Sequence, residues 1–145
     1  MKKDTLYSVG DTEMVNARTK GHNAEREFIH YLEENGITGL TRNLDQTRDG
    51  GSDILGLPQL CIEVKRCETL NIEKWWQQTL NEVKGRQIPV LAYRQSRKHW
   101  TIITLGNIIY SQEVLRISID IDDWIIWIKA NIDKLRKNER SFHKS

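Results

Sequence analysis

Two carboxylates and one amine stand close enough in the sequence to act on the same small group. They are Asp53, Glu63 and Lys65. Two carboxylates side by side repel unless a cation lies between them, and oxygen ligands at this density suit Mg²⁺ or Mn²⁺. A neighbouring lysine would orient an attacking water or stabilise developing negative charge. The spacing therefore favours a metal-assisted hydrolytic site.

This convergence depends on a hairpin. If residues 52–56 and 60–66 pair around Pro58, the two carboxylates lie opposite each other, on the face that the lysine shares. A slip of one residue would send the aspartate to the other face. The alternative is an exposed strand face that carries only a glutamate–lysine pair.

The helix expected over residues 21–35 supplies a third acid. On a wheel of about 100° per residue, its buried stripe consists of Ala24, Phe28 and Leu32. Glu25 falls at the edge of this stripe, where a carboxylate is costly unless a charged group meets it. It could be a third metal ligand, or it could pair with an arginine such as Arg42 or Arg48.

A second helix is expected from an N-cap at Asn71 to about residue 84. Gln77 and Gln78 flank its apolar side, and periodicity does not choose between them. Either amide could hydrogen-bond a metal-bound water or a phosphate, and either could simply face solvent.

The remaining elements complete the order helix, three strands, helix, two strands, helix. Further strands are expected over residues 37–44, 88–93 and 100–105. The last helix begins after Ser118 or Asp120, and Ile126 and Trp127 add a second apolar stripe to it. The order predicts an α/β fold with a mixed β-sheet flanked by helices. The surplus apolar surface on the last helix suggests a homodimer.

Charge is unevenly distributed over the 145 residues, although the net charge is only +2. Residues 21–65 hold eight acids and four bases, whereas residues 84–98 hold five bases and no acid. An acidic block beside a basic segment could hold a metal and a polyanion together, or could reflect solvated faces. We expect a flexible arm at 1–20, a single domain at 21–136 and a basic tail at 137–145. Because the chain shows no membrane-spanning run or signal peptide, we expect a cytoplasmic protein.

Four separated motifs, which extend over about residues 20–105, resemble the PD-(D/E)xK nuclease superfamily. They are GHNAERE, R-x(5)-R-D-G-G-S-D-I, C-I-E-V-K and the helix with WWQQ. The first resembles archaeal-type Holliday junction resolvases, and WW-x-Q followed by PVLAYRQSRKHW resembles the small phage-encoded endonucleases of that group. Ser52 replaces the proline that gives the superfamily its name.

The resemblance implies a restriction-endonuclease-like core and a DNA endonuclease that depends on Mg²⁺ or Mn²⁺. It implies that Glu25, Asp53 and Glu63 bind the metal, that Lys65 is the catalytic lysine, and that Gln78 is the matched glutamine. Such resolvases act as twofold dimers on branched DNA. The expected phosphate contacts are Arg48, Arg86, Arg94, Arg97 and Lys98.

The expected activity is therefore cleavage of DNA phosphodiesters, most specifically at Holliday junctions, in the cell that expresses the chain or in a phage host. A less selective nuclease for duplex, nicked or flap DNA is the alternative in the same class. An inactive DNA-binding or assembly module is an alternative of another class, as is a protein-interaction domain. The inactive module predicts junction binding that EDTA does not change.

Overall fold

The computed structural model describes residues 23–45 and 50–138 of the chain. A helix over residues 23–34 comes first. The strands are β1 (Thr41–Arg42), β2 (Ile54–Leu55), β3 (Leu60–Arg66), β4 (Ile88–Arg94), β5 (Thr101–Gly106) and β6 (Leu115–Asp120). The later helices are α4 (Ile72–Glu82), α5 (Ile121–Ala130) and α6 (Ile132–Leu135).

The main sheet has four strands in the order β3-β4-β5-β6. β3 and β4 are parallel and are joined through α4, whereas β4–β5 and β5–β6 are antiparallel. The short strands β1 and β2 form a separate antiparallel pair. The predicted α/β class with a mixed sheet is confirmed.

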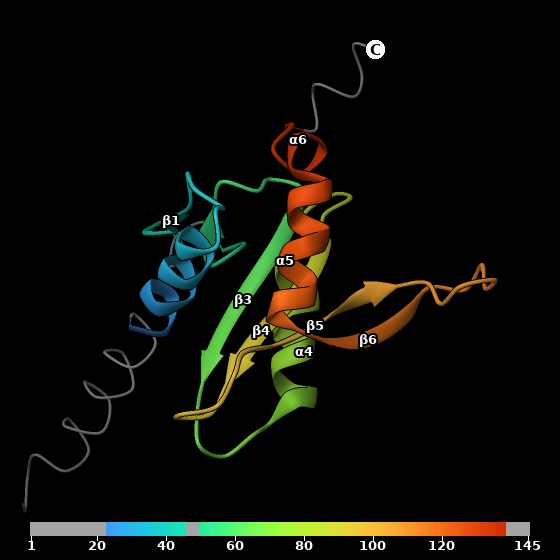
Figure 1. The fold of residues 1–145 in the computed structure, drawn as a ribbon. Helices are drawn as coiled ribbons and strands as arrows, with labels where there is room; N and C mark the ends of the chain where they lie inside the picture. Colours follow the sequence, from blue (N-terminus) through green and yellow to red (C-terminus); the bar gives the residue numbers. More distant parts are fainter. Residues whose placement is uncertain (1–22, 46–49, 139–145) are drawn as a thin grey trace, which may run out of the picture.

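Helices cover both faces of this sheet (Figure 1). The helix over residues 23–34 and α5 pack on one face, where the larger core includes Phe28, Ile62 and Trp124. α4 packs on the other face, where a smaller core joins its tryptophans to Leu91 and Ile103. The molecule is therefore a three-layer sandwich with a thin layer on the α4 side.

The alternation of β3 decides which side chains meet each layer. Leu60, Ile62 and Val64 belong to the larger core, as their spacing predicts. Glu63 is paired in register with Leu91, which lies in the smaller core, so its side chain points toward the α4 side. An acid thus stands where an apolar residue would otherwise complete that layer.

The predicted hairpin around Pro58 is wrong in its pairing. β2 pairs with β1, Thr41 opposite Leu55 and Arg42 opposite Ile54, and not with β3. One backbone bond joins the two segments, from the N–H of Asp53 to the carbonyl of Ile62 at 2.7 Å. The Ser52 hydroxyl accepts the N–H of Ile62 at 2.8 Å. The Asp53 carbonyl, which would accept the N–H of Ile62 in a regular hairpin, accepts the N–H of Asn43 at 2.9 Å instead, so a side chain takes its place.

Two further expectations need correction. The strand expected over residues 37–44 is reduced to Thr41–Arg42. β6 was not expected at all, and it precedes the last helix directly. The Asp120 N-cap of α5 is confirmed, since its side chain accepts the N–H of Asp122. The arm at 1–20 and most of the tail at 137–145 lie outside the described residues.

β5 and β6 form a hairpin that extends away from the body of the molecule (Figure 1). Its far end carries large apolar side chains in contact with solvent. They are Ile108, Ile109, Tyr110 and Val114. In the part of the chain that the structure covers, no helix is both long enough and apolar enough to cross a membrane.

Phe28 is the test of the larger core, because it is fully buried and its ring lies 5.2 Å from that of Trp100 and 6.0 Å from that of Trp124. We expect Phe28→Ala to lower the free energy of unfolding by about 3–5 kcal/mol. Urea denaturation measures this change. The matched control is Tyr110→Ala, a fully exposed aromatic, which should cost less than about 0.5 kcal/mol. Equal losses would contradict the core described here.

Candidate functional site

Asp53 and Glu63 lie side by side at the outer edge of β3. Asp53 is 5% exposed and Glu63 is 8% exposed. Asp53 reaches across to β3, where its Oδ2 accepts the N–H of Val64 at 2.8 Å. Two of the predicted site residues are therefore brought together, although by a different route from the expected hairpin.

The pKa of Glu63 is raised by its surroundings. Burial and then the negative charge of Asp53 raise its pKa from 4.5 to about 8, with smaller contributions from Glu82 and Glu25. Lys65 opposes this shift, and its Nζ lies 3.9 Å from Glu63 Oε1. Glu63 Oε2 is buried and has no hydrogen-bond partner among the described residues. A buried carboxylate oxygen without a donor is costly, so the site is suited to a positive ligand.

Of its two expected roles, metal ligand and partner of an arginine, Glu25 takes the second in this structure. Its Oε2 accepts from Arg42 Nε at 2.9 Å, and both side chains are largely buried. It still lies near enough to raise the pKa of Glu63. The oxygens of Glu25, Asp53 and Glu63 do not all come within 4.8 Å of one another. To share one ion, Glu25 would have to turn from Arg42.

The two glutamines of α4 differ in burial. Gln77 is exposed, whereas Gln78 is partly buried and its Oε1 has no partner in the described part of the chain. Gln78 is therefore the inward residue of the pair that periodicity could not separate.

The expected phosphate contacts divide into two kinds. Arg94 is engaged, because its Nη2 donates to Glu27 Oε2 at 2.8 Å and its guanidinium lies 5.4 Å from the centre of the Trp100 ring. The exposed residues are Arg86, Arg97 and Lys98. Arg48 lies outside the described residues. The exposed residues keep their charges at the surface, whereas Arg94 is held inside an ion-pair network.

Glu82, the last residue of α4, is a site neighbour that the sequence analysis missed. Its Oε2 accepts the N–H of Gly51 at 2.5 Å, and its charge contributes to the raised pKa of Glu63. An acid is unfavourable at a helix C-terminus, where the dipole is negative. That misplacement is the sequence signal that could have identified it.

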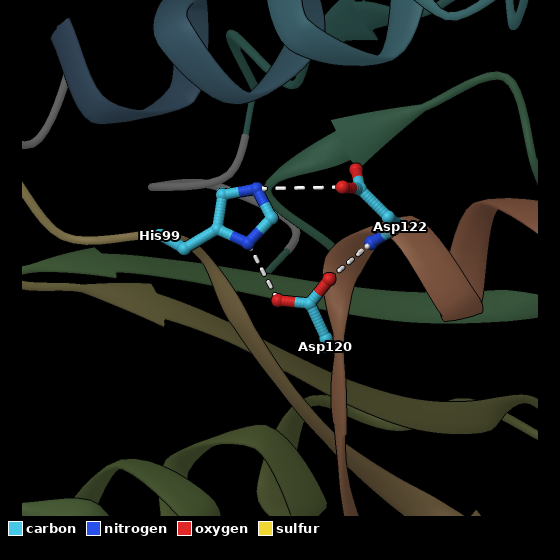
Figure 2. Close-up of side chains that lie close together, drawn as sticks. All are labelled: His99, Asp120 and Asp122. Carbon is cyan, nitrogen blue, oxygen red and sulfur yellow. Dashed lines mark hydrogen bonds and ion pairs between the residues drawn. The ribbon is translucent and has the colours of Figure 1, made fainter.

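A second polar group lies on the opposite side of the larger core. One ligand atom each from His99, Asp120 and Asp122 lies within 4.8 Å of the other two. Figure 2 shows the imidazole between the two carboxylates, with Nδ1 2.5 Å from Asp120 Oδ1 and Nε2 3.7 Å from Asp122 Oδ2. All three side chains are exposed.

These contacts have a structural explanation. Asp120 is the N-cap of α5, and the Tyr31 hydroxyl donates to Asp122 at 2.5 Å and lies 3.0 Å from His99 Nε2. The bond to Asp122 and burial raise the pKa of Tyr31 to about 12. Burial acts against ionisation of Asp120, but bonds from the Asp122 backbone and His99 outweigh it and lower its pKa. The group joins the first helix to the start of α5.

Comparison of the chain with protein-family models, with curated proteins and with solved structures gives no match. The chemistry of the site therefore has to be inferred from its own residues. Two buried carboxyl groups, Asp53 and Glu63, with one orphaned oxygen and the Lys65 amine beside them, carry oxygen ligands of the kind that a hard divalent cation takes.

The raised pKa of Glu63 predicts the pH dependence of stability without metal. The folded chain holds a proton on Glu63 between about pH 4.5 and 8, where the unfolded chain has lost it. The free energy of unfolding should therefore fall as the pH rises through this window. Glu63→Gln should flatten the fall, as measured by urea denaturation in EDTA at several pH values.

Glu73→Gln is the control for this measurement. A bond from Arg116 lowers the pKa of Glu73, so that its titration ends below the window. It should leave the slope between pH 5 and 8 unchanged. If Glu63→Gln also leaves the slope unchanged, the electrostatic description of the site is wrong.

Proposed function

We propose that this protein is a divalent-metal-dependent DNA endonuclease. The observation that carries the proposal is the buried pair Asp53 and Glu63 beside Lys65, with Glu63 Oε2 unpartnered. Such an arrangement is unfavourable for Glu63 in an ordinary structural site, because burial and three neighbouring acids oppose its charge and the Lys65 amine lies 3.9 Å away. A divalent cation would relieve it.

Asp53 and Glu63 would hold such a cation. Glu25 would be a third ligand once its carboxylate turns away from Arg42. The cation would be Mg²⁺ or Mn²⁺, and it would supply Lewis-acid chemistry, lowering the pKa of a water and neutralising phosphate charge. These ligands come from three segments, namely the first helix, the chain before β2, and β3. The fixed sheet edge would set their geometry.

Lys65 and Gln78 supply the polar groups around this centre. Lys65 would orient the attacking water or stabilise charge on the phosphate oxygens, since its amine lies beside the Glu63 carboxylate. Gln78 Oε1 is a free acceptor in the described structure, suited to receive a proton donor such as a water. Together they would orient the attacking water.

DNA is the proposed substrate, and branched DNA the proposed preference. The exposed cations Arg86, Arg97 and Lys98 could contact phosphates without regard to sequence. The resemblance of four ordered motifs to the PD-(D/E)xK nuclease superfamily supports a restriction-endonuclease-like core, and the resemblance of the first motif to archaeal-type Holliday junction resolvases supports the preference. A mixed sheet with an acid-bearing edge strand is compatible with that core.

The activity is tested with a synthetic four-way junction and Mg²⁺. We expect the wild-type chain to cut it, and Asp53→Asn and Lys65→Ala to lose about 100-fold or more of the rate, because each removes charge stabilisation at the reacting phosphate. Glu73→Gln, an exposed residue on the same side of the sheet, should cut like the wild type. Equal cleavage by wild type and Asp53→Asn would rule out the catalytic assignment.

A panel of junction, flap, nicked and linear duplex DNA separates the related activities. Preference for the junction supports a resolvase, whereas equal rates indicate a general nuclease. Junction binding that EDTA leaves unchanged, without cleavage of any substrate, would identify an inactive binding module.

We also propose that the protein acts as a homodimer, which would place two sites on one branched substrate. The support is α5, where Ile126 is 68% exposed and Trp127 is 38% exposed although the opposite face of the helix is buried in the core. A solvated isoleucine and tryptophan together form an apolar patch that a second copy could cover.

Light scattering coupled to size exclusion should give twice the monomer mass at micromolar concentration. Ile126→Asp should shift the mass toward the monomer, because a charge placed in an apolar interface must be desolvated. Lys134→Asp, a change of an exposed residue on the neighbouring α6, should leave the dimer intact. A wild-type monomer at this concentration would exclude the dimer.

A further inference from the structure

Glu82 connects the end of α4 to the segment that carries Asp53. Its Oε2 accepts the N–H of Gly51 at 2.5 Å, two residues before Asp53. The bond spans 31 positions in the sequence and is charge-assisted, the stronger kind of hydrogen bond. It is the contact through which α4 holds this segment from the side of the smaller core.

The backbone next to this carboxylate is shaped to receive it. Gly50 and Gly51 have φ angles of +65° and +88°, which side-chain-bearing residues rarely adopt. A Cβ at Gly50 would lie 2.8 Å from Glu82 Oε2, closer than such contacts allow. The two glycines thus let the backbone approach the carboxylate closely.

A second residue holds the same segment from the opposite side. The Asn43 amide donates to the carbonyl of Ser52 at 2.9 Å and to that of Gly50 at 3.3 Å. Asn43 and Glu82 therefore both hold the Gly50–Gly51 peptide group, and Asn43 also holds the Ser52–Asp53 peptide group. The position of the Asp53 carboxylate depends on this approach as well as on its own bond to Val64.

The position of Glu82 is costly, which argues that it has a specific task. It lies at the negative end of the α4 dipole and close enough to Glu63 to raise the pKa of that acid. The last turn of α4 holds no basic residue, and Lys84 follows just beyond the helix with its Nζ near Gly51. The bond to Gly51 helps to compensate the cost of this position.

We propose that Glu82 is a positioning residue that holds the Gly50–Gly51 backbone, and with it Asp53, in the arrangement that binds the divalent cation. This inference rests on the proposed metal-dependent function. Glu82 acts here through a backbone N–H donor, so that the reach of its side chain decides whether the bond forms, and its charge only strengthens that bond. A role as a metal ligand would reverse these requirements.

Two conservative variants separate reach from charge. Glu82→Gln keeps the length and an acceptor oxygen but removes the charge, whereas Glu82→Asp keeps the charge but is one methylene too short. We expect Glu82→Asp to weaken Mn²⁺ binding about tenfold, the equivalent of one hydrogen bond to a charged group. We expect Glu82→Gln to stay within about threefold of the wild type, because the amide preserves the bond.

Isothermal titration with Mn²⁺ measures the affinities, and Glu73→Asp and Glu73→Gln are the matched controls on the same helix. Both controls should bind like the wild type, since Glu73 pairs with Arg116. Junction cleavage by Glu82→Asp should recover at high Mn²⁺, because the variant weakens binding and leaves the reacting groups intact. Glu82→Gln as weak as Glu82→Asp, or Glu82→Asp equal to the wild type, would overturn the inference.

Amide hydrogen exchange gives a readout that needs no metal. Exchange at Gly51 should accelerate about tenfold in Glu82→Asp and stay close to the wild-type rate in Glu82→Gln. A wild-type chain that binds no Mn²⁺ would contradict the proposed function, whereas exchange at Gly51 still decides whether Glu82 holds the segment. Unchanged exchange in Glu82→Asp would show that it does not.

Discussion

The outer edge of β3 presents backbone groups that cannot be left without partners inside the protein, and residues 52 and 53 meet that requirement. The Ser52 hydroxyl accepts the N–H of Ile62, the Asp53 N–H binds the Ile62 carbonyl, and the Asp53 carboxylate accepts the N–H of Val64. Satisfying this edge brings Asp53 beside Glu63. The same bonds that complete the sheet thus bring two buried carboxyl groups together at one point.

Arginines pair with the acids around this point. Glu25 pairs with Arg42, and Glu27 pairs with both Arg66 and Arg94 at 2.8 Å. Those acids lie where long guanidinium side chains can reach. The ion pair of Glu63 is with Lys65, whose Nζ lies farther away, at 3.9 Å. Glu63 is therefore less well compensated than the acids that pair with arginines.

The sequence predicted the elements whose pattern reflects burial. The alternation of β3 and the apolar run of β4 follow directly from the faces they present, and Asp120 caps α5 as expected. β6 was not predicted because none of its residues is fully buried, although Ile117 and Ile119 alternate with polar residues and Ile119 packs against the larger core. The pairing of residues 52–56 was predicted wrongly because the Ser52 hydroxyl replaces a backbone hydrogen-bond acceptor, and hydrophobic periodicity does not reveal such a replacement. The role of Glu82 was not predicted because its hydrogen-bond partner is a backbone N–H that lies 31 positions away in the sequence.

The extended β5–β6 hairpin has a consequence for handling the molecule. Its tip, around a fully exposed Tyr110 with a φ of +69°, carries few contacts with the body. Proteases cut most readily at such tips, and insertions are tolerated there best. A cut there would leave both strands held by their own pairing, so the nicked chain would stay assembled. The tip is thus a natural place to attach a tag or a fluorescent label without disturbing the acidic edge of β3.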